Sequence, residues 1–341
     1  MRIAINGFGR IGRTFLRVLL EKGVGGNGGN GGVEVVAINI GTLNPELVAH
    51  TFKYDTTMGV FEGAVSVSGN VLTIGSHKIL LFAELSAESL PWRSHSIDWV
   101  VECSGHYTKA EDAYQHIRAG AKKVLISAPA TGADCTVIPG VNNQIFDANN
   151  HLIVSLGSCT SNALLPMLKV IHEACGIKRA FVVTTHAYTN TQALLDGGAS
   201  SSKDLRKHRA APLNIIPAST GADRMVGEVL PELQGRVSAL AIRVPVSNVS
   251  LLEVTWVAER AVSTESILAA FDSAASKGAL QGILLTTAEQ LVSSDYLKHP
   301  ASVIIDKPLC SVREDMGTAF GWYDNEWGYS CRLRDFLVSA Q

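Results

Sequence analysis

Two side chains able to perform covalent chemistry lie 27 residues apart near the middle of the chain. Cys159 stands in the segment SLGSCTSN, just before an apolar stretch of helical spacing, Ala163–Ala174. A cysteine at a helix N-terminus faces the positive end of the helix dipole, which lowers its pKa and favours the thiolate. His186 follows an apolar run of β character and can project from a strand end. Such a pair could activate the sulfur for attack on a carbonyl carbon and move protons.

Each of these residues also has an ordinary structural explanation. A single cysteine is more often a buried, inert thiol, and a single histidine can be a hydrogen-bonded structural residue. Pro166 adds a constraint, because a proline inside the apolar stretch predicts a helix that is kinked early or begins late. The pair is therefore a candidate that other parts of the sequence have to support.

A glycine-rich turn at the start of the chain is typical of dinucleotide binding. The segment INGFGRIGR contains G-x-G-x-x-G directly after a strand-like run and before a helical one. Gly7 allows the tight turn, Gly9 lets the backbone approach a pyrophosphate, and Gly12 permits close packing of helix on strand. The helix N-terminus supplies N–H groups and a positive dipole end. This context makes the motif a strong signal, whereas the glycines alone would fit an ordinary βα turn.

The second strand lacks the acidic residue that usually binds the adenosine ribose. This strand ends VAINIGT, with Ile40 directly after Asn39 where an Asp or Glu is expected. An aliphatic side chain accepts no hydrogen bond from ribose, and it carries no charge to repel a 2′-phosphate. We therefore predict that NADP is accepted, alongside NAD or in preference to it. The alternative is an NAD enzyme with weaker adenosine affinity.

Short apolar strands alternate with helical stretches through the first 155 residues, which is typical of a parallel sheet with helices on its faces. The predicted strands are Arg2–Asn6, Val33–Asn39, Trp99–Cys103, Val124–Ser127 and Leu152–Ser155. The predicted helices are Arg10–Lys22, Pro45–Phe52 and Ala110–Ala119. The tract Gly25–Gly32, GGNGGNGG, is predicted to be a mobile loop between the first helix and the second strand, because glycine loses too much entropy in regular structure.

From about residue 180 the strands become longer and the helices fewer, which predicts an α+β second domain. The strands expected there are Ala180–Thr185, Val237–Val244, Val249–Val257, Ser302–Asp306 and Gly317–Tyr323, and the C-terminal stretch Tyr329–Ala340 has helical spacing. The predicted fold class is α/β, a Rossmann-type doubly wound parallel sheet with a second α+β catalytic domain. Residues 1–158 plus 324–341 would form the NAD(P)-binding domain and residues 159–323 the catalytic domain.

Bulk composition excludes several functional classes. The 341 residues are 46% hydrophobic and 18% charged, which suits a globular protein, and the net charge of −2 gives no field to hold nucleic acid or an anionic membrane. We expect no transmembrane helix and no signal peptide. Six scattered cysteines without zinc spacing predict a reduced, cytoplasmic protein without a metal site.

Six segments resemble the signature segments of the phosphorylating glyceraldehyde-3-phosphate dehydrogenase family. They are INGFGRIGR, SCTSN, HAYTNTQ, NIIPASTGA, RVPVSNVS and WYDNEWGYS. They fall in the family's order with near-family spacing, and the similarity runs from residue 1 to about residue 335. The resemblance implies the oxidation and phosphorylation of D-glyceraldehyde 3-phosphate to 1,3-bisphosphoglycerate by a cytoplasmic homotetramer. The physiological direction, glycolytic or gluconeogenic, stays open.

The resemblance also implies a role for each matched residue. Cys159 would carry the thioester formed as hydride passes to NAD or NADP, and His186 would be the base. Arg10 and Ile11 match the pyrophosphate turn, Ser127 the adenosine side, and Asn325 the residue that orients the nicotinamide amide. The substrate phosphate would be bound by Thr189, Thr191 and Arg243. Inorganic phosphate would be bound by Ser158, Thr160, Thr220 and Gly221.

Alternative functions remain open at this point. Erythrose-4-phosphate dehydrogenase shares the scaffold, although Thr189 and Thr191 favour the triose phosphate. A non-catalytic nicotinamide-binding regulatory protein is disfavoured by four intact residues, Cys159, His186, Arg243 and Asn325. A generic semialdehyde dehydrogenase is disfavoured by the match at HAYTNTQ. The segment 195–204 resembles the family's S-shaped loop but lacks a proline often found in NAD-specific members, which agrees with relaxed cofactor specificity.

Overall fold

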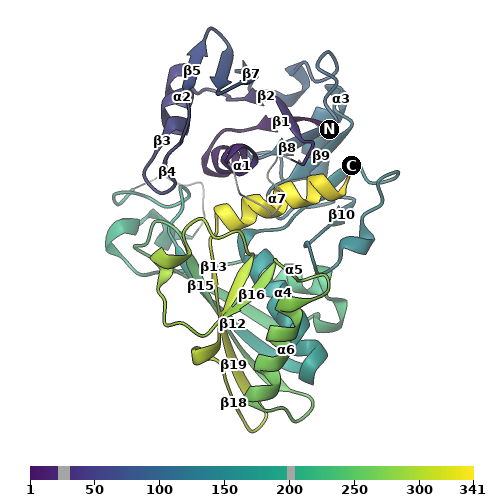
Figure 1. Cartoon of the computed structure of the whole chain (residues 1–341), viewed down its shortest axis with the longest axis vertical. Helices are drawn as coiled ribbons and strands as arrows, with labels where there is room; N and C mark the ends of the chain where they lie inside the picture. Colours follow the sequence, from purple (N-terminus) through teal and green to yellow (C-terminus); the bar gives the residue numbers. More distant parts are fainter. Residues whose placement is uncertain (22–30, 198–203) are drawn as a thin grey trace. The chain divides into compact units, whose positions relative to one another are not determined.

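The computed structural model describes residues 1–21, 31–197 and 204–341 and divides the chain into two units (Figure 1). The first unit comprises Met1–Val137, Asn143–Ser158 and Ser330–Gln341, and the second comprises Ile138–Asn142 and Cys159–Tyr329. Relative to the expected domains, residues 138–142 and 324–329 therefore fall in the second unit. The predictions for the Gly25–Gly32 tract and the S-shaped loop lie largely outside the described residues.

The first unit is built on a nine-stranded sheet of order β10-β11-β9-β8-β1-β2-β7-β6-β5, in which pairing is parallel from β10 to β7 and antiparallel from β7 to β5. Its strands are β1 (Arg2–Asn6), β2 (Glu34–Asn39), β5 (Val65–Ser68), β6 (Val71–Ile74), β7 (His77–Phe82), β8 (Trp99–Glu102), β9 (Lys123–Ile126), β10 (Cys135–Thr136) and β11 (Ile153–Ser155). Its helices are α1 (Arg10–Leu20), α2 (Pro45–Lys53) and α3 (Ala110–Arg118), and β3 (Tyr54–Asp55) pairs with β4 (Gly59–Val60) in a separate hairpin.

The central strands form because their residues are buried on both faces. All four residues of β8 are buried, as are four of the five in β1, and such continuous apolar runs are typical of parallel strands covered by helices. The five strands predicted for this unit are confirmed, each to within one residue at either end. The antiparallel edge β5–β7 was not predicted, because its alternating, half-exposed residues do not stand out as apolar runs.

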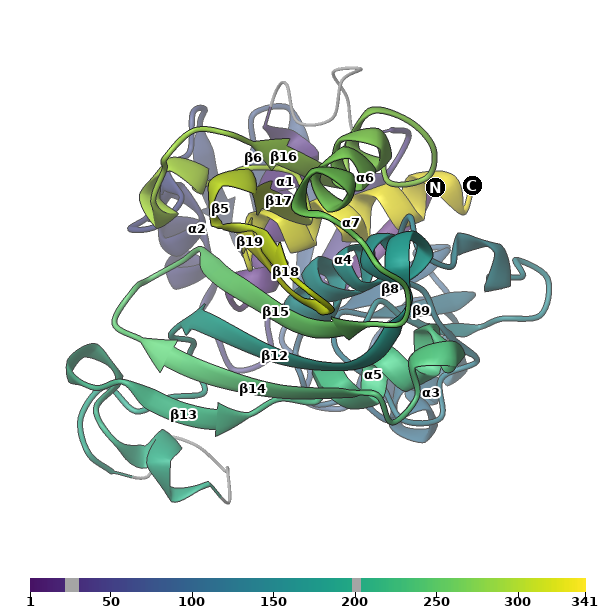
Figure 2. The same ribbon diagram turned by 90° about the horizontal axis from the view of Figure 1, so that it is seen from below.

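The second unit carries a mixed sheet of order β13-β14-β12-β15-β19-β17-β16, with β18 paired to β19 (Figure 2). Its strands are β12 (Ile177–Ala187), β13 (Ile216–Ser219), β14 (Val237–Val244), β15 (Ser250–Ala258), β16 (Leu284–Thr287), β17 (Val303–Asp306), β18 (Ser311–Arg313) and β19 (Met316–Tyr323). Its helices are α4 (Cys159–Cys175), α5 (Ala222–Val229) and α6 (Thr264–Ser276), while α7 (Trp327–Ser339) crosses the boundary between the units. Within the described ranges, the 3₁₀ turns are Ala87–Ser89, Asn143–Ile145, Leu205–His208, Ala211–Leu213, Pro231–Leu233, Ser293–Tyr296 and Lys307–Leu309.

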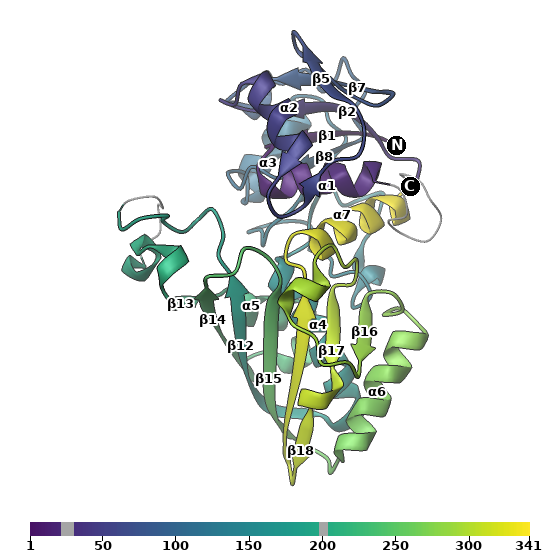
Figure 3. The same ribbon diagram turned by 60° about the vertical axis from the view of Figure 1, so that its left-hand side comes forward.

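Helices α4, α5 and α6 pack on one face of this sheet (Figure 3). The main core of the unit lies between these helices and the sheet. Buried residues of this core include Leu164, Met225 and Phe271 from the three helices and Val254 and Trp256 from β15. The α+β character predicted for this part of the chain is therefore confirmed. The predicted strand Ala180–Thr185 is longer than expected, since β12 runs to Ala187 and so includes His186.

Helix α4 begins at Cys159 and continues through Pro166. Of the two alternatives predicted from Pro166, the late start is therefore wrong. Proline cannot donate a hydrogen bond to the carbonyl four residues before it, but here that cost is offset by burial, because Leu164, Leu165 and Met167 around the proline are fully buried. The helix therefore places Cys159 at its first position. Among the residues that the structure describes, no helix is both long and apolar enough to span a membrane.

Candidate active site

The first unit contains a cavity of about 600 Å³ at the carboxyl ends of β1, β2 and β8. Ligands of open α/β sheets bind at this edge, where neighbouring connections diverge. The residues lining the cavity are Asn6, Gly7, Gly9, Asn39, Ile40, Gly41, Thr42, Glu84, Leu85, Cys103, Ser104, His106 and Tyr107. The structure thus brings together the predicted cofactor residues Gly7, Gly9, Asn39 and Ile40.

The three motif glycines lie where a side chain would obstruct the turn or its ligand. Gly7 has φ +90°, and a Cβ there would lie 2.5 Å from the Cα of Ser104. A Cβ on Gly12 would collide with the Gly7 carbonyl, whereas Gly9 faces open space. The turn is therefore closed on its protein side and open at Gly9, which fits close approach by a pyrophosphate group. Together with the other residues that line the cavity, this turn forms a site able to hold a dinucleotide.

A buried polar network supports the floor of this cavity. Asn39 Nδ2 donates to Asn6 Oδ1 at 2.7 Å, and Asn6 Nδ2 donates to Glu102 Oε2 at 2.5 Å. The other Glu102 oxygen accepts from the Ser104 backbone N–H at 2.6 Å, and His116 Nε2 lies 3.2 Å from Oε2. This network joins three adjacent strand ends. Its buried Glu102 follows an apolar run directly, which is the sequence signal that could have revealed it.

The other predicted cofactor residues lie outside the lining of this cavity. Arg10 and Ile11 begin α1, and the Arg10 guanidinium forms an ion pair with Asp55. Ser127 follows β9, and its hydroxyl donates to the Glu102 carbonyl at 2.7 Å. Asn325 belongs to the second unit. Their roles in cofactor binding stay predictions.

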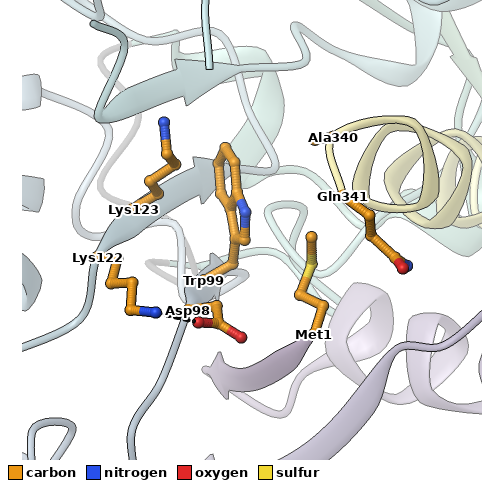
Figure 4. Close-up of a pocket in the computed structure, with 7 residues that line it drawn as sticks. All are labelled: Met1, Asp98, Trp99, Lys122, Lys123, Ala340 and Gln341. Atoms are coloured by element: carbon orange, nitrogen blue, oxygen red, sulfur yellow. Dashed lines mark hydrogen bonds and ion pairs between the residues drawn. The ribbon is translucent and has the colours of Figure 1, made fainter. Parts of the chain in front are cut away.

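A second cavity of about 340 Å³ also lies in the first unit (Figure 4). It is found at the opposite, amino ends of β1, β8 and β9, beside Met1, Trp99 and Lys123. Its Lys122 already forms an ion pair with Asp98 at 2.8 Å, and the Lys123 ammonium donates to the carbonyl of His151 at 2.8 Å. Because its charged groups are satisfied within the protein, we assign this cavity no function.

In the second unit, Cys159 and His186 lie together as the sequence predicts. The Cys159 Sγ at the start of α4 is 3.7 Å from His186 Nε2 near the end of β12. His186 is buried, with 3% of its surface exposed, and Cys159 is half-buried. The contact is close enough for a proton to pass between sulfur and imidazole. An inert thiol beside an unrelated histidine does not explain this geometry.

Arg243 and the Ala187 carbonyl both contact the His186 imidazole at Nδ1. Arg243 lies opposite His186 in the parallel pairing of β12 with β14. Its Nη1 lies 2.5 Å from His186 Nδ1 and donates to the Ala187 carbonyl at 2.9 Å. The Ala187 carbonyl oxygen also lies 2.7 Å from Nδ1, so this nitrogen meets one group that can only donate and one that can only accept. When Nδ1 donates to the carbonyl, the lone pair of Nε2 faces Cys159 and can accept the thiol proton. Burial, together with the charge of Arg243, lowers the pKa of His186 to about 3.

Burial also raises the pKa of the Cys159 thiol. The charge of Arg243 and hydrogen bonds from Thr160 oppose the shift without reversing it. The expectation of a lowered cysteine pKa is therefore wrong, because desolvation of the sulfur outweighs these effects. The structure does confirm the helix N-terminal position on which that expectation rested.

Tyr323 lies beside Cys159 and His186 and was missed by sequence reasoning. Its hydroxyl lies 3.2 Å from Thr160 Oγ1 and 2.7 Å from Thr184 Oγ1, and its ring packs edge-on against His186. Burial raises its pKa, so the hydroxyl is protonated at neutral pH. Tyr323 is the first residue of YDNEWGYS, within one of the six signature segments, and this position could have pointed to it.

The predicted phosphate-binding residues are placed on several elements. Thr189 and Thr191 follow β12, and their hydroxyl oxygens are 2.9 Å apart. Thr220 and Gly221 precede α5, where Thr220 Oγ1 accepts from the Ala222 N–H at 3.3 Å. Ser158 is the last residue of this part of the first unit. The structure brings Thr189 and Thr191 together and leaves the remaining phosphate assignments as predictions.

Comparison with known proteins identifies the family. Residues 1–110 match the model for glyceraldehyde 3-phosphate dehydrogenase, NAD binding domain, and residues 158–325 match that for its C-terminal domain. The glyceraldehyde-3-phosphate dehydrogenase of Streptomyces coelicolor is 43% identical over 340 residues, covering 99% of this chain and 98% of the relative. Those of Kitasatospora aureofaciens and Geobacillus stearothermophilus are 45% and 44% identical, each over at least 97% of both chains.

The chain belongs to the glyceraldehyde-3-phosphate dehydrogenase family.

Membership in the glyceraldehyde-3-phosphate dehydrogenase family confirms the resemblance and the fold class. It identifies the N-terminal part of the chain, with its cavity, as the family's NAD-binding domain. It also makes the chain an oxidoreductase of this family, so the Cys159–His186 contact lies in the C-terminal domain of a dehydrogenase. The rival of a non-catalytic binding protein is thereby disfavoured.

Acidification is expected to destabilise this glyceraldehyde-3-phosphate dehydrogenase fold through His186. The unfolded chain takes up a proton near the ordinary value of 6.5, whereas the folded chain does so only near pH 3. The unfolded state therefore binds more protons between these values, and stability falls as the pH falls through 6.5. For this group we expect a loss of about 2 kcal/mol between pH 7 and pH 5.

Urea unfolding of the wild-type and His186→Asn chains at both pH values measures this contribution. The variant should lose about 2 kcal/mol less than the wild type on acidification. Replacing the exposed His77 by asparagine is the matched control and should leave the acid-induced loss in place. Equal losses in wild type and His186→Asn would contradict the prediction.

Proposed function

We propose that this chain catalyses the phosphorylating oxidation of D-glyceraldehyde 3-phosphate to 1,3-bisphosphoglycerate. The observation that carries the proposal is the 3.7 Å contact between Cys159 Sγ and His186 Nε2 in a chain of this family. The Cys159 sulfur adds to the aldehyde carbon, and the thiol proton is transferred through His186. When bound, NAD or NADP accepts the hydride from that carbon. The carbon is thereby oxidised to a thioester on Cys159, and His186 takes the hydroxyl proton.

Inorganic phosphate then attacks the thioester carbon, and the carbon–sulfur bond breaks to release the acyl phosphate and the Cys159 sulfur. Arg243, Thr189 and Thr191 would bind the substrate phosphate, because a guanidinium with hydroxyl donors suits a phosphate dianion. Ser158, Thr160, Thr220 and Gly221 would bind the attacking phosphate. Asn325 would hold the nicotinamide carboxamide.

Steady-state kinetics of the purified chain test this proposal. With glyceraldehyde 3-phosphate, cofactor and phosphate present, we expect reduction of the cofactor that depends on all three. Erythrose 4-phosphate is the discriminating substrate. A higher kcat/KM for the four-carbon sugar phosphate would overturn the triose assignment, and turnover without phosphate would overturn the acyl-phosphate product.

We further propose that the chain uses NADP as well as NAD. Ile40 is 4% exposed and lines the cavity next to Asn39, so no carboxylate stands at that position to repel a 2′-phosphate. The wild type is expected to prefer NAD by less than about a hundredfold in kcat/KM, which corresponds to about 2.7 kcal/mol.

Replacing Ile40 by aspartate is expected to shift this preference toward NAD. The introduced carboxylate would accept the ribose hydroxyls of NAD and repel the extra phosphate of NADP. We expect the ratio of kcat/KM for NAD to that for NADP to rise by about tenfold or more. An isoleucine-to-leucine change at the same position keeps the apolar character and serves as control. An unchanged ratio in Ile40→Asp would show that this strand end does not select the cofactor.

A homotetramer is also proposed. Phe181 on β12 is 52% exposed on the sheet face opposite the helices, and Leu194, Leu205, Leu213 and Ile215 are each more than 70% exposed. Exposed apolar residues in such numbers favour association. Light scattering should give about four times the chain mass of 36.3 kDa, and Phe181→Glu should give smaller species. A monodisperse monomer would contradict the proposal.

All six cysteines lie in the described part of the chain as free thiols. Free thiols suit a reducing compartment, and we propose the cytoplasm as the location of the protein.

A further inference from the structure

The Ser250 hydroxyl links the strand of the catalytic histidine to the segment that carries Asn325. Ser250 opens β15 and is 1% exposed. Its Oγ accepts a hydrogen bond from the Ala187 N–H at 3.1 Å and donates one to Asn325 Oδ1 at 2.9 Å. Ala187 directly follows His186, and its carbonyl accepts from Arg243. One hydroxyl therefore connects the peptide beside the catalytic base to the predicted nicotinamide ligand.

The backbone beside Ser250 is strained at the point where the Ser250 hydroxyl binds the Ala187 N–H. Val249 has φ +68°, a conformation that a β-branched residue rarely adopts. Backbone pairing of β12 with β15 ends at Thr185 and Leu251. Beyond this point the Ala187 N–H donates its hydrogen bond to the Ser250 side chain and not to a carbonyl of β15. Strain of this kind persists where the surroundings impose it, and such positions concentrate at functional sites.

The backbone of Asn325 is held from the same strand end. The preceding residue, Asp324, accepts hydrogen bonds through Oδ1 from Asn248 Nδ2 at 2.9 Å and from the Trp327 N–H at 2.7 Å. Its Oδ2 accepts from the Lys298 N–H at 2.8 Å. Because these hydrogen bonds fix the main chain, the orientation of the Asn325 side chain depends on the hydrogen-bond partners of its amide group.

An asparagine amide has nearly the same shape when its oxygen and nitrogen are exchanged. Its orientation is therefore fixed by the hydrogen-bond donors and acceptors around it. Ser250 Oγ already accepts from Ala187 and has one hydrogen to give. Giving it to Asn325 Oδ1 turns the amide oxygen toward β15 and leaves the Nδ2 hydrogens for a carbonyl acceptor. That is the polarity needed to bind the carbonyl of a nicotinamide carboxamide.

We infer that Ser250 is a positioning residue for hydride transfer, which orients the Asn325 amide toward the nicotinamide and ties it to the His186–Ala187 strand end. This inference rests on the proposed function. It assigns to Ser250 a role exerted through Asn325, without contact with substrate or cofactor.

The variant Ser250→Ala tests the inference. We expect its cofactor KM to rise about tenfold, since loss of one oriented hydrogen bond is worth roughly one decade. Alkylation of Cys159 by iodoacetate without cofactor should change by less than about twofold, because that reaction uses Cys159 and His186 alone. Ser330→Ala removes a fully buried hydroxyl without a hydrogen-bond partner among the described residues and is the matched control. It should behave as the wild type.

A double-mutant cycle distinguishes an effect of Ser250 exerted through Asn325 from a general loss of structural order in the Ser250→Ala variant. If Ser250 acts through Asn325, adding Ser250→Ala to Asn325→Ala should change kcat/KM by less than about threefold. Multiplicative losses, an unchanged cofactor KM in Ser250→Ala, or alkylation slowed as much as turnover would each overturn the inference. Binding of NADH measured by protein fluorescence needs no turnover. A wild type that binds NADH without oxidising the triose phosphate would contradict the proposed function. The effect of Ser250→Ala on NADH affinity would then still test the inference about Ser250.

Discussion

Replacing Cys159 by serine is expected to lower kcat for phosphorylating oxidation by about ten-thousandfold or more, equivalent to about 5.5 kcal/mol of transition-state stabilisation. The loss is large because a serine hydroxyl at neutral pH is a poor nucleophile and an alkoxide a poor leaving group, so both formation and breakdown of the acyl-enzyme fail. Cofactor affinity should be retained, because the G-x-G-x-x-G turn and its cavity are built from other residues. Rapid-mixing kinetics and NADH titration of the same preparation measure the two quantities.

Cys135→Ser is the matched control for this experiment. Cys135 is also half-buried, but it lies on β10 in the first unit, and burial raises its pKa to about 11. This variant should keep full activity and remain sensitive to iodoacetate. Substantial activity in Cys159→Ser, or loss of activity in Cys135→Ser, would show that the nucleophile has been assigned to the wrong cysteine.

The His186→Asn variant is expected to lose between about a hundredfold and ten-thousandfold in kcat, the usual contribution of a general acid–base. Asparagine can fill part of the same volume, but it cannot take the proton from the thiol or from the hemithioacetal. Alkylation of Cys159 by iodoacetate should also slow at neutral pH, since the imidazole that faces Sγ at 3.7 Å is lost.

The pH profile adds a second readout for this variant. Because the pKa of His186 lies near 3, the imidazole is neutral throughout the range from pH 6 to pH 9. The rise of wild-type alkylation with pH in this range should therefore follow ionisation of Cys159, whose pKa burial raises. A wild-type profile with an inflection near pH 6.5 would instead show that His186 titrates normally and would contradict the electrostatics described here.

Much of the first unit could be predicted from sequence because its signals are local. The strands β1, β8 and β11 are short apolar runs, and α1 follows a glycine turn whose spacing is itself the motif. The edge strands β5–β7 were missed because half-exposed residues on an antiparallel edge alternate weakly and carry no apolar run. Their order in the sheet depends on pairing between β2 and β7, which no local pattern encodes.

The active-site residues divide in the same way. The sequence by itself determined the family, and it singled out Cys159, His186 and the motif glycines as candidates, because these rest on residue types at near-fixed spacing. The tertiary structure alone decided the registry of His186 with Arg243, the contacts of His186 Nδ1 and the burial that raises the cysteine pKa. The links from Ser250 to Asn325 and from Glu102 to Asn6 were equally hidden. The reason is physical: pKa values and side-chain orientation depend on desolvation and on partners that lie 75 and 96 residues away along the chain, and only folding brings them together.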